Sequence, residues 1–389
     1  MSDQQTETQT SSNNKSQQRK KGLSIFILLL LLISIGSAAY WYLFIKGFEE
    51  TEDAYVSGNQ VMVSAQVAGN ISKINVDNMD PVQAGDVLLE LDDTNAKLSF
   101  EQAKSNLANA VRQVSQLNYT VKQLKSAVRA NEITLAQAQG NLNRRVQLVK
   151  DGAIDKESFQ HAKEAVELAK ANLTTSQNQL GANQALLLDG PLSEQPQIQS
   201  AVSNLKQAWL NLERTKIRSP IKGYVARRNA QVGQAVSVGG ALMAVVTTDQ
   251  MWLDANFKET QLTHMRIGQP AEIHFDLYGK DKTFDGKVVG IEMGTGSAFS
   301  LLPAQNATGN WIKVVQRVPV RIQLDPQQLA ENPLRIGLSA TVKVNVTDSQ
   351  GETLRDQAPA TPLYSTNVLQ YDESAVNNLI ESIIRDNSY

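Results

Sequence analysis

The chain has 389 residues, enough for two or three small domains, with no cysteine and a formal net charge of −2. The lack of cysteine excludes disulfide bonds, a thiol nucleophile, cysteine-based zinc or iron–sulfur sites and a lipid-modified N-terminal cysteine. The nearly neutral charge gives no support for nucleic-acid binding.

The N-terminal region predicts a disordered tail followed by a membrane-spanning helix. Residues 1–21 are rich in Gln, Ser, Thr and Asn and have almost no apolar side chains, which is typical of disordered segments. Residues Gly22 to Ile45 carry no charge. As a helix they would reach about 36 Å, which exceeds the ~30 Å hydrocarbon core of a bilayer. We therefore predict a transmembrane helix over residues 22–45.

The charges on either side of this helix predict its orientation. Lysine and arginine precede it and acidic residues follow it, so the positive-inside rule places the N-terminus in the cytoplasm and the remainder outside, as a single-pass protein. A cleaved signal peptide that ends near Ser37-Ala38-Ala39 is the alternative. Both interpretations export the rest of the chain. No second stretch is apolar enough to span a membrane, so the chain alone cannot be a transport channel.

Two copies of one β motif, separated by a long insert, are the strongest signal in the chain. The first copy runs from Val63 to Leu91 and the second from Ile217 to Val245, with a constant offset of 154 residues and no gap. Both copies are rich in Val and Ile and interrupted by Gly, which predicts short strands joined by tight turns. Repeated β units of this kind are expected to pair with each other. Residues 63–93 and 217–246 therefore form one split domain.

The insert between the copies, residues 94–216, predicts an antiparallel helical hairpin. Apolar residues recur every seven positions in both arms, 94–149 and 155–215, which is a coiled-coil pattern. They are Phe100, Leu107, Val114, Val121, Val128, Leu135, Leu142 and Val149 in the first arm, and Phe159, Val166, Leu173, Leu180 and Leu187 in the second. Each arm would be roughly 80–90 Å long, and a local break is expected in the second arm at residues 189–196.

Short polar segments predict where the arms begin and turn. Asp93 or Thr94 is the expected cap of the first arm, and Asp155 is the expected N-cap of the second. Asp151-Gly152 predicts the turn between them. Because the arms have similar lengths, the hairpin returns the chain to its starting point, as pairing of the two β motifs requires.

The remaining segments predict a β-barrel and a polar tail. Residues 46–62 read as a linker and the first strand of the barrel, and residues 247–347 as the rest of it, because they contain alternating runs bounded by Gly and Pro. Residues 348–389 are polar, with a short amphipathic helix expected within Ala375 to Arg385. The predicted fold is an α+β multidomain protein.

No catalytic, cofactor or metal site is predicted. The chain lacks the G-x-S-x-G, Walker and H-E-x-x-H motifs. Its three histidines, His161, His264 and His274, are far apart in the sequence, and paired carboxylates such as Asp92-Asp93 are typical of helix caps and solvated charge. We therefore expect a protein that is not an enzyme.

The paired β motifs resemble the two halves of a biotinyl/lipoyl carrier domain. In such carriers a short hairpin between the halves presents the modified lysine. The helical insert replaces that hairpin here, so no cofactor is expected.

The predicted chain combines a split lipoyl-like domain, a long α-helical coiled-coil hairpin, an N-terminal transmembrane helix and a following β-barrel domain. This combination resembles the membrane fusion proteins, the periplasmic adaptors of the HlyD family. The resemblance extends to about Val346. It is also carried by four segments: Phe48 to Gln60, Ala255 to Gln261, Met265 to Ile273 and Met293 to Arg317.

This resemblance implies an adaptor in a tripartite multidrug efflux system of a Gram-negative bacterium. Such an adaptor is anchored in the inner membrane, lies mostly in the periplasm and bridges an inner-membrane pump to an outer-membrane channel. The implied pump is a major facilitator drug/proton antiporter, and the implied channel is of the TolC type. One two-helix hairpin encloses no tube, so we expect a homo-oligomer, a trimer or a hexamer.

The resemblance also implies a docking site at the hairpin tip. Adaptors of this family contact the channel there through an Arg-x3-Leu-x6-Ser pattern. Arg144 and Leu148 match the pattern, whereas Asp155 occupies the serine position. The expected docking residues are therefore Arg144, Leu148 and Asp155, with the identity of the channel left open.

Three other functions fit the same sequence. The chain could be the adaptor of an ABC-type exporter, or a membrane-tethered coiled-coil scaffold with no transport role. It could also bind a hydrophobic compound in its β domains, although no aromatic-lined pocket can be read from the sequence.

Overall fold

The computed structural model of the chain describes residues 23, 26–37, 47–279, 281–296, 298, 313–358 and 360–388. These form two compact units, Met1–Gln60 with Val246–Ser365, and Val61–Val245 with Thr366–Tyr389. The predicted disordered tail, residues 1–21, lies outside the described residues. Of the predicted membrane helix over 22–45, only Leu23 and residues 26–37 are described, and they are helical. Within the described residues, no helix combines the length and the apolar character that crossing a bilayer requires.

A six-stranded β-barrel forms most of the first unit. Its strand order is β1-β12-β9-β10-β11-β8, and an additional pairing of β1 with β8 closes it. The strands are β1 (Phe48–Ser64), β8 (Ala241–Lys258), β9 (Pro270–Phe275), β10 (Phe284–Ile291), β11 (Arg317–Leu324) and β12 (Ser339–Asn345). The short helices η3 (Glu259–His264) and α5 (Pro326–Glu331) lie between them in the sequence. The predicted β-barrel is therefore confirmed.

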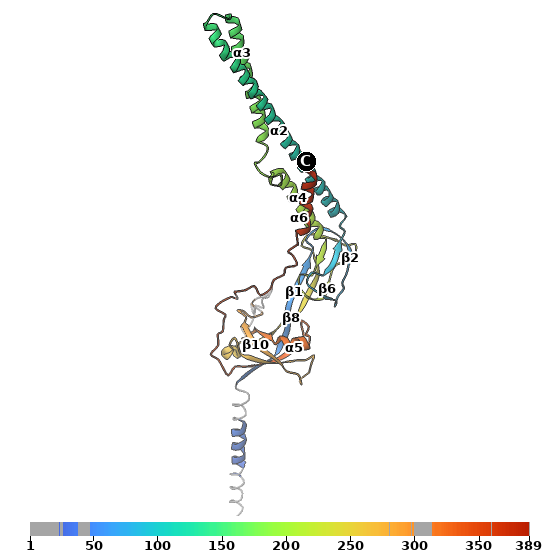
Figure 1. Cartoon of the computed structure of the whole chain (residues 1–389). Coiled ribbons are helices and arrows are strands. Elements are labelled where there is room, and N and C mark those ends of the chain that lie inside the picture. Colours follow the sequence, from blue (N-terminus) through green and yellow to red (C-terminus); the bar gives the residue numbers. More distant parts are fainter. Residues whose placement is uncertain are drawn as a thin grey trace, which may run out of the picture. The chain divides into compact units, whose positions relative to one another are not determined.

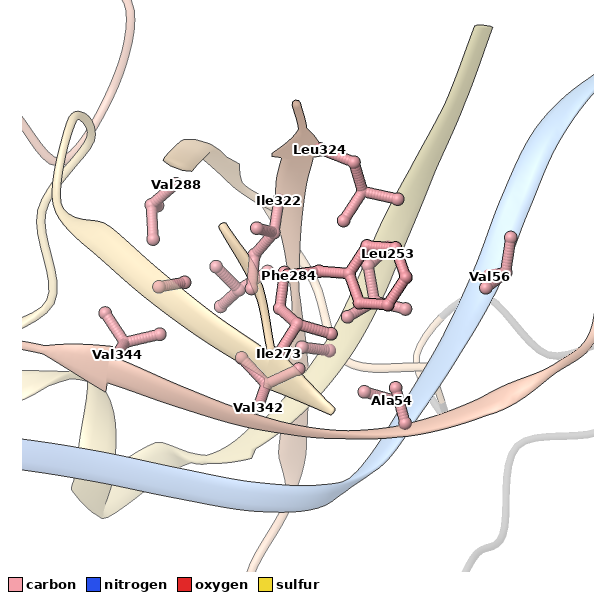
Figure 2. Close-up of a cluster of buried hydrophobic side chains, with 14 of the residues drawn as sticks. Ala54, Val56, Leu253, Ile273, Phe284, Val288, Ile322, Leu324, Val342 and Val344 are labelled. Carbon is pink, nitrogen blue, oxygen red and sulfur yellow. The ribbon is translucent and has the colours of Figure 1, made fainter. Parts of the chain in front are cut away.

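The barrel is filled by the apolar positions that alternate along each strand. In β12, Ala340, Val342 and Val344 are buried while their neighbours are partly exposed, which is the period-2 pattern of a strand with one apolar face. Phe275 and Phe284 meet edge to face inside, with ring centroids 4.9 Å apart. Side chains from β1, β8, β9, β10, β11 and β12 line this interior, and Figure 2 shows several of them converging there.

The second unit contains a lipoyl-like sheet in which the two β motifs pair as the repeat predicts. Four of its strands form one sheet in the order β5-β4-β2-β7, namely β2 (Gly69–Ile74), β4 (Val87–Leu91), β5 (Lys216–Arg218) and β7 (Ala235–Val236), and β6 (Gly223–Arg228) and β3 (Pro81–Val82) continue the other sheet beyond β8. Pro81 pairs with Tyr224, and Ala235 pairs with Asn70. The two pairs are equivalent under the offset of 154 residues, since Pro81 corresponds to Ala235 and Asn70 to Tyr224. Each half of the repeat therefore pairs with the other half in the same way.

The helical hairpin is confirmed, and Figure 1 shows its two arms side by side. The first arm is one helix, α2 (Thr94–Lys150). The second arm comprises α3 (Lys156–Gln184), the short η2 (Leu192–Glu194) and α4 (Pro196–Glu213). A hydrogen bond of 2.6 Å from Asn131 Nδ2 to Ser176 Oγ fixes the register of α2 against α3.

Two local expectations differ from the structure. Asp93 holds the N-cap position of α2 as expected, but its side chain makes no capping hydrogen bond; Asp92 Oδ1 accepts from the backbone N–H of Thr94 instead, at 3.0 Å. The break in the second arm begins earlier than predicted. Helix α3 ends at Gln184, ahead of the Gly-Pro pair at 190–191. The Gln195 amide closes this break with hydrogen bonds to both backbone groups of Leu188, at 3.0 and 2.8 Å.

The polar tail ends in a helix that packs onto the base of the hairpin. Helix α6 (Ser374–Asn387) lies against α2 and α4. It buries Val376 and Ile380 in one apolar cluster with Leu107, Ile198 and Leu205. Lys206 and Glu373 form an ion pair at 2.8 Å beside it. The hairpin base is therefore a three-helix bundle and not a two-stranded coiled coil.

Candidate functional site

The hairpin tip is a tight turn closed by backbone hydrogen bonds. The backbone N–H of Ala153 donates to Leu148 O at 2.8 Å and that of Gly152 donates to Val149 O at 3.1 Å. These two bonds form the Schellman motif that ends many helices, and it requires a left-handed residue just after the helix. Gly152 occupies that position with φ 69°. The tip is therefore built as a defined turn between α2 and α3.

Asp155 starts the second arm as its N-cap. Its Oδ1 accepts from the backbone N–H of Ser158 at 2.9 Å, which satisfies one of the free donors in the first turn of α3. Hydrogen bonds from the Ser158 side chain and backbone lower the pKa of the Asp155 carboxyl. The carboxylate is therefore ionised at neutral pH and directed at its own helix.

Arg144 and Leu148 lie one helical turn apart in the last turns of α2. The i, i+4 spacing places them on the same side of the helix. Leu148 is 42% exposed, and the exposed guanidinium of Arg144 donates to Asn141 Oδ1. An exposed arginine beside an exposed apolar side chain is suited to contact with another protein, since arginine is enriched at such interfaces and their buried centre is apolar. The structure thus places all three expected docking residues at the same end of the hairpin.

The described residues contain no group of three or more His, Asp or Glu side chains that could hold a metal ion. His161 is exposed on α3 next to Glu157 and Glu164, at 3.6 and 3.8 Å. At the tip, the Asp155 carboxylate is engaged in capping α3.

A cavity of about 530 Å³ beside α4 was not visible in the sequence. It is lined by Trp209 and Arg214 from α4 and its end, and by Tyr371 from the segment before α6. Trp209 and Tyr371 meet edge to face at 6.3 Å. The tail supplies one wall, and no periodicity in residues 348–389 indicates that the tail returns to the hairpin.

Comparison with known proteins identifies both characteristic domains. Residues 94–215 match the family described as the EMRA alpha-helical hairpin domain, and residues 250–345 match the AAEA-like beta-barrel domain. The multidrug export protein EmrA of Haemophilus influenzae is 77% identical over 355 residues, which cover 91% of this chain and 91% of the relative. The multidrug export protein EmrA of Escherichia coli is 50% identical, with the same two coverages of 91%.

A solved structure described as the periplasmic adaptor protein EmrA aligns with 77% of this chain and 99% of its own, at 20% identity and a TM-score of 0.41. The segments Phe48 to Gln60 and Met293 to Arg317 are among those that predict the EmrA type within the adaptor family. The two curated relatives confirm this prediction, together with the predicted role in multidrug export and the expectation of a protein that is not an enzyme. The chain belongs to the EmrA family of multidrug export adaptor proteins.

Proposed function

We propose that this protein is the periplasmic adaptor of a tripartite multidrug efflux system. In this proposal residues 22–45 anchor it in the inner membrane with the N-terminus in the cytoplasm. It bridges a major facilitator drug/proton antiporter of the EmrB type to an outer-membrane channel of the TolC type, and it acts as a trimer or hexamer. The names of its curated relatives, which describe multidrug export, support the general role.

The observation that carries the proposal is the hairpin with its capped tip. Helix α2 has 57 residues, so it reaches about 85 Å, far more than a packing contact within a small domain needs. It ends in a rigid turn that presents Leu148 and Arg144 to solvent. A helix of this length, ending in a turn that exposes an apolar and a cationic side chain, is suited to reach and contact a second membrane component.

The tip variants Leu148→Asp and Arg144→Glu test this proposal in cells that depend on the protein for drug resistance. Both are expected to abolish resistance while expression and membrane insertion stay normal, because a buried charge or a reversed charge disrupts a docked interface. Arg112→Glu is the matched control, since Arg112 is an exposed arginine of the same helix near its base. Unchanged resistance in both tip variants would rule out docking through the tip.

Two alternatives make different predictions. An adaptor of an ABC-type exporter would purify with an ATPase instead of an antiporter. A coiled-coil scaffold without a transport role would leave drug accumulation unchanged in a deletion strain. Affinity purification of the tagged full-length protein from its own cells, followed by identification of the co-purified membrane proteins, separates these two from the proposed function.

A further inference from the structure

The side of α2 that faces away from α3 is basic above the hairpin base. From Lys122 to Lys150, α2 carries six basic residues and one acidic residue, Glu132, and three of the basic residues, Lys122, Arg129 and Lys150, share one heptad position on this side. The seam with α3 uses the position of Asn131 and its heptad equivalents. The opposite positions form the α2 outer face, which is exposed and includes Lys122, Arg129, Asn143 and Lys150.

The side of α3 that faces away from α2 carries two glutamates at its centre, beside a row of lysines. Ala162 and Ala169 are buried in the seam, so Glu157, Glu164 and Leu168 lie on the opposite, α3 outer face. The side chains of Glu157 and Glu164 are 82% and 62% exposed, and Leu168 is 65% exposed. The lysines of α3 repeat every seven residues along one flank of this face, at Lys156, Lys163 and Lys170.

The register of the hairpin places these two faces at matching heights. Asn131 and Ser176 are hydrogen bonded across the seam. Counting 19 residues toward the tip on α2 reaches Lys150, and the same count on α3 reaches Glu157. Counting 12 residues on each helix reaches Asn143 and Glu164. Basic or neutral positions on one outer face therefore lie level with acidic positions on the other.

Gly140 gives α2 one position without a side chain. It is the only glycine in α2, and glycine is among the least favourable residues inside a helix. A Cβ at Gly140 would meet nothing closer than Arg144 Nη1 at 3.9 Å, so no contact within the described chain requires a glycine there. Counted from the same hydrogen bond, Gly140 lies within one residue of the height of Leu168, the exposed leucine of the α3 outer face.

We propose that the α2 outer face of one copy binds the α3 outer face of the next copy, with Leu168 seated over Gly140 and Lys150 paired with Glu157. This inference rests on the proposed function, since it supplies the contact by which the adaptor forms an oligomer. A two-fold contact between like faces would bring glutamates next to glutamates, or basic side chains next to basic side chains, whereas a head-to-tail contact brings Lys150 of one copy to Glu157 of the next. Head-to-tail contacts form a ring when the rotation between copies closes, and rotation about a ring axis keeps equivalent residues at equal height.

Mixed-copy cysteine crosslinking tests this contact, and the chain has no cysteine of its own. One copy carries Asn143→Cys and a differently tagged copy carries Glu164→Cys; both are expressed together as full-length protein. The two outer-face cysteines lie at equal height, so oxidation is expected to link the two tags. Ser126→Cys with Glu164→Cys is the matched control, because Ser126 lies about 26 Å further down α2 than Asn143, and this pair is expected to stay unlinked.

Charge reversal tests the same contact without cysteines. Lys150→Glu and Glu157→Lys are each expected to raise the concentration at which the oligomer dissociates about fivefold. The double variant restores the pair in every interface and is expected to return to the wild-type value, as measured by mass photometry.

An oligomer of normal size without the Asn143–Glu164 crosslink, or a double variant weaker than both single variants, would overturn this contact. The proposed function would then stand with a different interface. Monomers only, in wild-type protein purified with its pump, would overturn both.

Discussion

Met79 and Gly233 occupy equivalent positions in the two halves of the lipoyl-like sheet, and both have left-handed backbones, with φ 74° and 82°. The Met79 N–H donates to Val225 O and the Gly233 N–H donates to Ile71 O, each at 2.8 Å. The turn that joins the strands therefore demands a left-handed residue in both halves. Only one half supplies glycine, and Met79 is the one non-glycine residue with positive φ in the described part of the chain.

Met79→Gly is expected to stabilise the lipoyl-like sheet by up to about 1 kcal/mol. A left-handed non-glycine residue costs roughly 1–2 kcal/mol, and the larger backbone entropy of glycine in the unfolded chain offsets part of the gain. Hydrogen exchange of β2 and β6 in the full-length protein, followed by mass spectrometry, measures the change.

Gly233→Met is the matched reverse test of the same turn. It is expected to destabilise the sheet by a similar amount, about 1 kcal/mol, because a Cβ there meets nothing within 4 Å and only the backbone conformation is penalised. Equal protection in wild type and both variants would contradict a conformational cost at this turn.

The parts of the fold that periodicity encodes were predictable from the sequence. The seven-residue spacing that includes Leu107 and Val121 predicts the seam, and both are buried there. The offset of 154 residues predicts the reciprocal pairing of Pro81 with Tyr224. In both cases one repeated distance along the chain determines which residues face each other, so no knowledge of distant segments is needed.

The hairpin base was not predictable in the same way. Val111 lies outside the predicted seam, yet it is fully buried, because it packs in one cluster with Val376 and Ile380 of the third helix at the hairpin base. An amphipathic pattern in residues 375–385 shows that α6 needs a partner but does not say which surface it covers. Likewise, Asp93 occupies the N-cap position of α2, but only the backbone path shows that the side-chain hydrogen bond at this helix start comes from Asp92.

For the expected docking residues, the sequence could place Arg144, Leu148 and Asp155 near one turn but not show their roles. The structure gives Asp155 a local one, since its carboxylate caps α3. Serine and aspartate are both strong N-caps, so aspartate at the serine position keeps the turn intact. The difference from the family pattern therefore concerns the charge offered at the tip and not its backbone.

Ile380→Ala is expected to release α6 from the hairpin base. Ile380 is 6% exposed in the cluster formed with α2 and α4, and such truncations cost about 2–5 kcal/mol. Faster proteolysis of residues 366–388 and lower hydrogen-exchange protection of α4 measure the release. Glu381→Ala is the control, because Glu381 is the next residue of α6 and is exposed. It is expected to change stability by less than about 0.5 kcal/mol. Equal protection of α6 in both variants would contradict its role in the base.

Asp155→Ala is expected to fray the first turn of α3, because it removes the acceptor for the Ser158 N–H. Asp155→Ser is the matched control and is expected to keep the turn ordered, since a serine hydroxyl accepts the same bond. Hydrogen exchange of residues 155–160 distinguishes the two. If Asp155→Ser lost drug resistance while keeping this protection, the negative charge itself would be needed at the tip.

Three helix starts are expected to loosen together in acid. Asp92, Asp155 and Asp372 each accept hydrogen bonds at or next to the start of a helix, and these bonds lower the pKa of each carboxyl. A carboxyl whose pKa is lower in the folded state stabilises that state above its unfolded pKa, which is near 4 for aspartate. That contribution is then lost as the pH falls through the lowered pKa. Circular dichroism between pH 6 and pH 2 should therefore show helix loss that begins below about pH 4. A variant with all three aspartates changed to asparagine keeps a capping oxygen that does not titrate. Its helix content should therefore depend less on pH in this window. An unchanged pH profile in this variant would mean that other carboxylates cause the acid transition.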